Sequence, residues 1–356
     1  MNRPRFMPQP RSVAALAGLF AGALAGCSGA DPPAPDRGAA HVSILAVGDT
    51  GRRHVFFAPW FEGQLAVAAG MAASDQANPV DALVLLGDNF YDGGLQAYEL
   101  QERLRENLVG PYCGFVELDA SRSAEVAAAC RAPVSAGHAI PILAVPGNHD
   151  LADDGGLEAQ CTAVDDFVSN WQFACRQPVV LDLEGGLSVI AYDSASPGAA
   201  DRTDALALAI RRARGPFRVL ASHHPPGVSR DDGPTAEGAV FEAVRRAGVP
   251  VHAHLAGHNH SLQLLSREGT AIPLGVIAGS GARARPPIDR AHPDRVFGAS
   301  RLGFARLSVQ RAPGPPRLQV SLYSTPDWPL FGGGAPTLEA RWSVDAEGRV
   351  RDEGTR

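Results

Sequence analysis

Five short apolar runs in the sequence are each followed by a turn that carries carboxylate, amide or imidazole side chains. The runs cover residues 42–47, 83–86, 142–145, 217–221 and 249–255. They lead, in order, into Gly48-Asp49-Thr50-Gly51, Gly87-Asp88-Asn89-Phe90-Tyr91, Pro146-Gly147-Asn148-His149-Asp150, Ser222-His223-His224-Pro225 and Ala256-Gly257-His258-Asn259-His260. Such runs are typical of buried strands in an α/β sheet, whose binding residues lie in the loops beyond the strand ends.

The stretches between these runs have helical character, and the last part of the chain is rich in strands. Helices are expected at residues 60–73, 96–107, 158–171, 201–214 and 235–247. Further strands are expected at residues 262–265, 272–277, 304–309, 318–323 and 338–342. The pattern predicts an α/β fold of two mixed β-sheets packed face to face with flanking helices, and a long surface loop at residues 283–301.

The basic residues of the chain exclude several kinds of chemistry. The chain has 356 residues, enough for one large domain, and all 32 residues counted as Lys or Arg are arginine. Because there is no lysine, a Schiff-base mechanism, a pyridoxal-phosphate anchor and a Walker-type phosphate site are excluded. The formal net charge is −6 and no basic cluster is dense enough to follow a phosphate backbone, so we expect no nucleic-acid binding surface.

The amino terminus reads as a targeting segment. Three arginines precede an apolar run at residues 13–25, which is too short to span a bilayer as a helix. The run ends in Leu24-Ala25-Gly26-Cys27, which resembles the lipobox of bacterial lipoproteins. We expect an exported protein of the bacterial cell envelope, cleaved before Cys27 and held at the membrane by a lipid on that residue; an ordinary secretory signal is the alternative. Residues 27–40 are expected to be a flexible tether.

The four remaining cysteines are an even number in a chain expected to be exported. Export to an oxidising compartment favours disulfides over a thiolate metal site. We predict the pairs that are near in sequence, Cys113 with Cys130 and Cys161 with Cys175. Two other connectivities, and four reduced thiols, remain open at this point.

The polar residues beyond the strand ends form a set of metal-ligand types without sulfur. The set is Asp49, Asp88, Asn148, His223, His258 and His260. Oxygen and imidazole donors suit ions such as iron, manganese or zinc. Several carboxylates and imidazoles at one end of a sheet are electrostatically unfavourable without cations to neutralise them. Because Asp88 is central among the loops, it is the natural bridge between two ions about 3.5–4 Å apart.

Together, the five ordered motifs resemble the calcineurin-like metallophosphoesterases. Most of that superfamily has a histidine two residues after the first aspartate, whereas this chain has Gly51 there and Tyr91 three residues after Asp88. That pairing resembles the purple acid phosphatases, in which tyrosinate binds iron(III). The runs 87–91, 257–263 and 303–305 resemble the small, tartrate-resistant branch of those enzymes, and the similarity extends from about residue 42 to about residue 344.

The resemblance implies a role for individual residues. The first metal would be bound by Asp49, Asp88, Tyr91 and His260, and the second by Asp88, Asn148, His223 and His258. The ions would be iron with iron, zinc or manganese, and a metal-bound hydroxide would attack a phosphate monoester. Asn148, His149 and His224 would lie near the substrate, with Asp88 and His149 in the catalytic set. His149 would protonate the leaving group.

Several departures leave alternatives open. Leu220 stands where the family has valine, and Asp231-Asp232 stand where it has a second substrate-side histidine. Leaving-group protonation is therefore open between His149, His224 and an aspartate. The His223-His224-Pro225-Pro226 text also occurs in cyclic-nucleotide phosphodiesterases, which makes a phosphodiesterase the main alternative. A non-catalytic envelope lipoprotein is another. His252 and His254 alternate within a strand run, and ordinary hydrogen-bonded packing is the better interpretation.

The expected layout follows from these signals. Residues 1–26 form the signal peptide, 27–40 the tether, 41–345 a metallophosphoesterase catalytic domain and 346–356 a disordered tail. The expected protein is a monomeric acid phosphatase that acts on phosphorylated small molecules or proteins and meets the membrane only through the lipid at Cys27.

Overall fold

The computed structural model describes residues 40–52, 63–130, 139–228, 237–287, 292–311, 314–326 and 335–355. These residues belong to a compact unit that spans Pro35–Arg356. The predicted signal peptide, Cys27 and nearly all of the predicted tether lie outside the described residues and stay predictions. Within the described ranges, none of the helices combines the length and apolar character needed to cross a bilayer.

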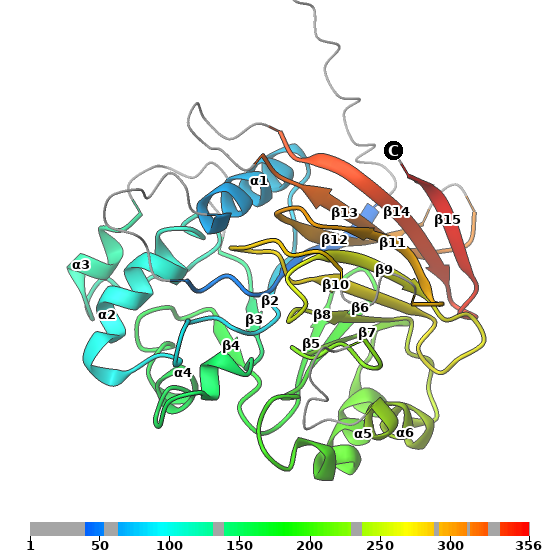
Figure 1. The fold of residues 1–356 in the computed structure, drawn as a ribbon, viewed down its shortest axis with the longest axis horizontal. Helices are drawn as coiled ribbons and strands as arrows, with labels where there is room; N and C mark the ends of the chain where they lie inside the picture. Colours follow the sequence, from blue (N-terminus) through cyan, green and yellow to red (C-terminus); the bar gives the residue numbers. More distant parts are fainter. Residues whose placement is uncertain are drawn as a thin grey trace, which may run out of the picture. The chain divides into compact units, whose positions relative to one another are not determined.

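Two mixed sheets form the framework, as the sequence predicts (Figure 1). The larger sheet has eight strands in the order β15-β14-β13-β12-β1-β2-β3-β4. Its strands are β1 (Ala40–Val47), β2 (Ala82–Leu85), β3 (Ile142–Ala144), β4 (Trp171–Phe173), β12 (Gly303–Gln310), β13 (Arg317–Ser324), β14 (Thr337–Asp345) and β15 (Val350–Thr355). Strands β1 to β4 are parallel to one another, and the others join antiparallel.

The second sheet has seven strands in the order β11-β9-β10-β8-β7-β6-β5. They are β5 (Val179–Leu183), β6 (Leu187–Ala191), β7 (Phe217–Ala221), β8 (Ala253–Ala256), β9 (Leu262–Ser266), β10 (Leu274–Ala278) and β11 (Arg295–Ala299). Strands β6, β7, β8 and β10 are parallel, which brings the loops after β7 and β8 to one end of the sheet.

Side chains alternate between two apolar environments along the central strands. Ile44 and Ala46 of β1 point into the core shared by the two sheets, whereas Leu45 and Val47 pack against Met71 of helix α1 (Gly63–Ala77). This two-residue period is that of a strand covered on both faces. The continuous apolar run at residues 42–47 is therefore explained by burial on both sides.

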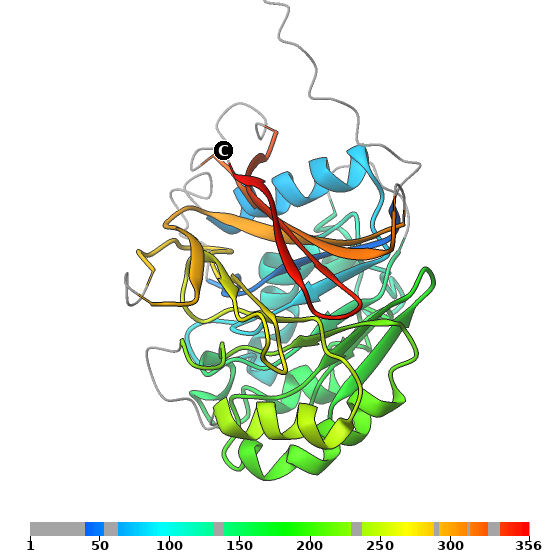
Figure 2. The ribbon, with the colours of Figure 1, turned by 90° about the vertical axis from the view of Figure 1, so that its right-hand side faces the viewer.

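Helices cover the outer face of each sheet (Figures 1 and 2). Helix α1 lies against the larger sheet, and α5 (Thr203–Arg212) and α6 (Glu237–Ala247) lie against the smaller one, where Ile210 and Val244 pack on Leu220. The shorter helical segments are η2 (Ala97–Glu99), α2 (Leu100–Arg103), η3 (Leu104–Val109), α3 (Ala124–Ala127), η4 (His149–Leu151), α4 (Glu158–Thr162) and η5 (Ala199–Arg202). The predicted fold class is confirmed.

Four local predictions need correction. The helix expected at residues 158–171 ends at Thr162, and Trp171 begins β4 because it pairs with β3. The helix expected at 96–107 is divided into 3₁₀, α and π segments. The loop expected at 283–301 contains β11, and residues 350–355 of the expected disordered tail form β15 along the edge of β14.

Both predicted disulfides are present. Cys113 is bonded to Cys130 and Cys161 to Cys175, with Cα atoms 5.3 Å and 5.7 Å apart. The first links the segment after η3 to the segment after α3, and the second links α4 to the segment after β4. They fasten short helical segments that lack long apolar faces of their own.

Candidate metal centre

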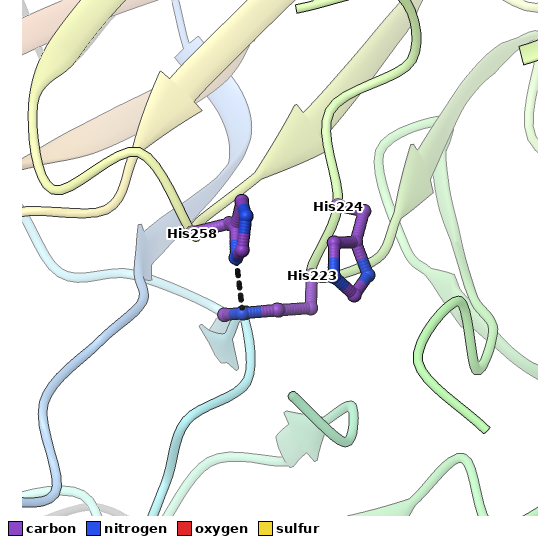
Figure 3. Close-up of side chains that lie close together, drawn as sticks. All are labelled: His223, His224 and His258. Carbon is purple, nitrogen blue, oxygen red and sulfur yellow. Dashed lines mark hydrogen bonds between the residues drawn. The ribbon is translucent and has the colours of Figure 1, made fainter. Parts of the chain in front are cut away.

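The predicted ligands meet beyond the carboxyl ends of strands from both sheets. Asp49 follows β1, Asp88 and Tyr91 follow β2, and Asn148 follows β3. The other three, His223, His258 and His260, follow β7 and β8 of the second sheet. Figure 3 shows His223 and His258 pointing toward one another from their two loops, with His224 beside them. The fold therefore brings together residues that are as far as 211 positions apart in sequence, since 260 − 49 = 211.

Three donor atoms form a first group. The hydroxyl of Tyr91 donates a hydrogen bond to Oδ1 of Asp49 at 3.1 Å and lies 3.4 Å from Nε2 of His260. The third side, from His260 Nε2 to Asp49 Oδ1, measures 3.5 Å. Atoms that share one ion at about 2.1 Å stand about 3.0 to 3.4 Å apart, for octahedral and tetrahedral angles respectively. The group has the size of a single coordination sphere.

Three other donor atoms form a second group of the same size. Oδ1 of Asn148 lies 3.0 Å from Nε2 of His223 and 3.0 Å from Nδ1 of His258, and the two imidazole nitrogens are 3.2 Å apart. Because Nδ1 of His223 donates to the carbonyl oxygen of Leu86 at 2.8 Å, its Nε2 carries a lone pair that faces the group. A carbonyl oxygen and an imidazole lone pair converge here, as at a cation site.

Asp88 lies between the two groups. Its Oδ1 is 3.4 Å from Nε2 of His223 in the second group, and its charge acts on Tyr91 of the first, where it adds to the rise in the pKa of the phenol. Ligand atoms of Asp49, Asp88 and His223 all lie within 4.8 Å of one another. This is the position that a bridging carboxylate requires.

The backbone at the candidate ligands is strained. Among the described residues, five that are not glycine have a left-handed φ, and four of these are Asp49 (59°), Asp88 (53°), His258 (65°) and His260 (48°). Such conformations are costly for residues with a Cβ and persist where the surrounding structure imposes them. The strained residues are therefore candidate ligands, whose side chains converge on the metal centre.

Burial disfavours the charged form of five of the candidate ligands. Burial, with the nearby Asp88, raises the pKa of Asp49 well above its usual value, and burial with Asp49 does the same to the pKa of Tyr91. Burial lowers the pKa of His223 well below its usual value, that of His258 to about 2 and that of His260 to about 4. Buried carboxylates that lack a compensating cation are unfavourable, so the cluster fits cations rather than an empty cavity.

Asp150, which was not among the predicted site residues, fastens the second and third motifs to each other. Its buried carboxylate accepts backbone hydrogen bonds from Gly147, Asn89 and Phe90 at 2.8, 3.1 and 3.0 Å. Burial, and then the charge of Asp88, raises the pKa of Asp150 to about 7. Gln160 of α4 donates a further hydrogen bond at 3.0 Å. The final aspartate of the Gly-Asn-His-Asp motif thus has a structural role, because it holds the second and third motif loops together.

Glycine at position 51 is required by close packing. A Cβ atom there would lie 1.8 Å from the backbone oxygen of Asn89, so a histidine side chain cannot be added without moving the second motif. The Tyr91 amide donates to the carbonyl of Gly51 at 2.7 Å, which holds the tyrosine against the first motif. The hydroxyl of Tyr91 occupies the space beside Asp49 and His260.

Residues 42–262 match the calcineurin-like phosphoesterase family. This chain belongs to that family of metal-dependent hydrolases. The sequence resemblance to the superfamily is therefore confirmed, and the closeness to its purple acid phosphatase branch stays a prediction. No curated protein matches the chain in sequence at a significant level.

Two solved structures share the fold of this phosphoesterase at low sequence identity. One is described as GAP50, the anchor in the inner membrane complex of Plasmodium, with 14% identity, a TM-score of 0.56 and coverage of 84% of this chain and 89% of that one. The other is described as PhoD, with 11% identity, a TM-score of 0.56 and coverage of 88% and 72%. At such identities the likeness concerns the fold alone.

A cavity of about 310 Å³ opens over the candidate ligands of this phosphoesterase. Its described lining residues are Arg52, Asp88, Tyr91, Asp92, Asn148, His149, His258, Asn259, His260, Arg283 and Arg285. The arginines were not predicted, because they carry no motif. The cavity opens directly onto five of the seven candidate ligands: Asp88, Tyr91, Asn148, His258 and His260.

The two predicted substrate-side histidines differ in their surroundings. His149 lines the cavity, packs on Tyr91 with ring centroids 4.5 Å apart, and has Nδ1 3.0 Å from the carbonyl oxygen of Asp92. His224 is buried against the ring of His258, its amide donates to Ser194 Oγ at 3.0 Å, and it is not among the described residues that line the cavity. Residues 231 and 232 lie outside the described ranges.

His252 and His254 pack in the core, as expected. Nδ1 of His252 accepts a hydrogen bond from the Arg218 amide at 3.1 Å, and Nε2 of His254 lies 2.8 Å from the Tyr192 hydroxyl. Both side chains are buried. Neither reaches the metal centre of the phosphoesterase.

Proposed function

We propose that this protein is a binuclear-metal phosphatase of the purple acid phosphatase type, which hydrolyses phosphate monoesters. The observation that carries the proposal is the pair of three-atom donor groups, each with sides of 3.0 to 3.5 Å, joined by Asp88. In a member of a metal-dependent hydrolase family, two such groups at the base of a cavity support two ions and a phosphoryl substrate.

Asp49, Tyr91 and His260 would hold one ion, Asn148, His223 and His258 the other, and Asp88 would contact both. When bound, the two ions would polarise the phosphoryl group and lower the pKa of a coordinated water, so that a nucleophile is present near neutral pH. The set contains a phenol, carboxylates and imidazoles without sulfur, which supports iron paired with iron, zinc or manganese.

Tyr91 supports the purple acid phosphatase type. Position 51, where most of the superfamily has a histidine, has no room for a side chain, and the Tyr91 hydroxyl lies 3.1 Å from Asp49. Burial raises the pKa of the phenol, so a metal-free site keeps Tyr91 protonated. A trivalent cation would reverse that preference and give a tyrosinate with a visible absorption band. Tyr91→Phe should remove the band, and a band that survives would exclude Tyr91 as its source.

His149 is suited to protonate the leaving group. Its Nδ1 lies 3.0 Å from a carbonyl oxygen, which only accepts, so Nδ1 carries a hydrogen and Nε2 exchanges the proton. The side chain lines the cavity beside Asn148, whereas His224 does not. General acid catalysis by a positioned histidine typically contributes 10² to 10⁴ in rate. His149→Gln should therefore lower kcat on poor leaving groups more than on p-nitrophenol.

Turnover of two substrates tests the proposed reaction. We expect the purified chain to release p-nitrophenol from p-nitrophenyl phosphate much faster than from bis(p-nitrophenyl) phosphate. Faster turnover of the diester would replace the monoesterase by the phosphodiesterase that the His223-His224-Pro225-Pro226 text suggests. Absence of both activities in a metal-loaded chain would favour a non-catalytic binding protein, since the fold is shared with a structure described as an anchor.

We propose further that the chain is a lipoprotein of the bacterial cell envelope, anchored at Cys27. The lipobox-like ending and the two disulfides, which persist in oxidising compartments, support this localisation. Metabolic labelling with palmitate should mark the wild-type chain and not Cys27→Ser. Equal labelling of the two chains would contradict an anchor at Cys27.

A further inference from the structure

Polar residues line the cavity over the metal centre. Each described residue that lines it is charged, an amide, an imidazole or a phenol, and none is aliphatic. Pockets for drug-like or base-containing ligands are lined mainly by apolar and aromatic side chains. A substrate that fits this wall is compact and strongly hydrophilic throughout.

Three arginines lie on this wall, and two of them share one segment. The carbonyl oxygen of Arg283 lies 3.3 Å from Nδ1 of His260, and the amide of Arg285 donates to the His260 carbonyl oxygen at 2.6 Å. The segment is therefore fastened on both sides of Ala284 to a candidate metal ligand. The backbone of each arginine is therefore held in a fixed position next to His260, a candidate ligand of the ion that would bind the phosphate.

The guanidinium groups of Arg283 and Arg285 have no protein partner within the described ranges. No hydrogen bond or ion pair of either side chain is found there, whereas Arg202, Arg267 and Arg301 each pair with a carboxylate. Asp92 lines the same cavity and pairs with neither arginine in that part of the structure. Two cations that line the cavity and are unpaired in the described part of the chain can receive an anion.

The two arginines flank the first donor group. Their backbone atoms contact His260 on both sides of Ala284, and both residues line the cavity above the ligands. Guanidinium binds phosphate through paired, charge-assisted hydrogen bonds, which suits the recognition of a phosphate group more than of a neutral alcohol.

We propose that Arg283 and Arg285 form a second anion subsite and that the substrate is a compact bisphosphate, cleaved at one phosphate and held by the other. The proposal rests on the proposed phosphatase function. It adds to that function the claim that a second phosphate on the substrate, and not an apolar leaving group, determines substrate specificity.

Binding tests the subsite without turnover. Carbon–phosphorus bonds resist hydrolysis, so propane-1,3-bisphosphonate and propylphosphonate serve as probes in calorimetric titrations of the full chain. We expect the bisphosphonate to bind about tenfold more tightly, and Arg283→Gln/Arg285→Gln to remove that difference. Arg212→Gln is the matched control, because Arg212 is an exposed arginine of α5 that does not line the cavity. Equal affinity for the two probes in the wild-type chain would overturn the proposal.

Hydrolysis separates this proposal from the proposed function. With glucose 1,6-bisphosphate and glucose 6-phosphate, we expect about tenfold higher kcat/KM for the bisphosphate in the wild-type chain and a ratio of the two kcat/KM values near one in the double variant. Arg285→Lys should restore part of the preference. Active enzyme without the preference would overturn the subsite alone. A chain that binds the bisphosphonate preferentially and hydrolyses neither sugar phosphate would overturn the phosphatase and leave the subsite standing.

Discussion

Arg103 holds Tyr91 in place through the backbone. Nη2 of its fully buried guanidinium donates hydrogen bonds to the carbonyl oxygens of Tyr91 at 2.7 Å and Gly51 at 2.9 Å. Nε donates to Asn107 Oδ1 at 2.8 Å, and Asn107 in turn donates to the carbonyl oxygen of Arg52. A buried cation at the end of α2 thus ties together the first two motifs of the metal centre.

Removing that cation should be costly. Arg103→Met keeps the apolar stem and leaves the two carbonyl oxygens without their donor, so the free energy of unfolding should fall by about 3–5 kcal/mol. Denaturant titration measures this loss. Arg212→Met at an exposed position of α5 is the control and should change stability by less than about 0.5 kcal/mol.

Arg103→Met should also disturb the first donor group more than the second. The tyrosinate band should shift or weaken while the ligands His223 and His258, which belong to the other sheet, keep their ion. A normal absorption band together with normal stability would show that the hydrogen bonds of Arg103 have no part in positioning Tyr91.

Position 51 should reject even a methyl group. In Gly51→Ala the new Cβ would lie 1.8 Å from the backbone oxygen of Asn89, so the two motif loops must separate at a cost of about 1–3 kcal/mol or more. Gly238→Ala is the matched control, because nothing lies within 4 Å of its Cβ position and alanine favours the helix. Thermal unfolding should show Gly51→Ala less stable and Gly238→Ala equal to or more stable than wild type. An unchanged melting temperature for Gly51→Ala would contradict the packing described for the first motif.

Acid should destabilise the metal-free protein through its buried histidines. Burial lowers the pKa of His254 from 6.5 to about 3, so the unfolded chain binds a proton there that the folded chain does not. Stability from this residue is present above pH 6.5 and is lost as pH falls from 6.5 to about 3, at about 1.4 kcal/mol per pH unit. His254→Gln should reduce the slope of unfolding free energy against pH by about that amount. A variant with the wild-type slope would show that His254 titrates normally in the folded chain.

Strands could be predicted from the sequence where burial alone determines which positions are apolar. Residues 42–47 and 217–221 are mostly apolar because both faces of their strands are covered, and the sequence pattern predicts both strands. Strand β15 is not predicted, because its sequence is polar and pairing with the edge of β14 creates it. Strands β5 and β6 are not among the predicted strands, although they form an antiparallel pair whose connection contains Gly185-Gly186. The sequence pattern places Trp171 at the end of a helix, because the pairing of this residue with β3 is not local.

The candidate ligands were predictable because their residue types recur at strand ends, and the structure brings all seven together. The residues that hold them were not, because no local pattern marks them. Arg103 looks like an ordinary arginine of a surface helix until the fold buries it between two motifs. Arg283 and Arg285 lie in a segment without a motif, and they reach the cavity through hydrogen bonds to His260. The part that these arginines play at the metal centre follows only from their positions in the folded structure.

Metal content per chain tests the central claim most directly, because the claim is that two donor groups joined by Asp88 hold two cations. Elemental analysis of the purified wild-type chain should give about two ions of the iron, zinc or manganese class per chain. Asp88→Ala, which removes the carboxylate common to both groups, should lose both ions, while a variant at the exposed Arg212 should retain them. A wild-type chain that takes up no metal, or an Asp88→Ala chain that retains two ions, would contradict the account.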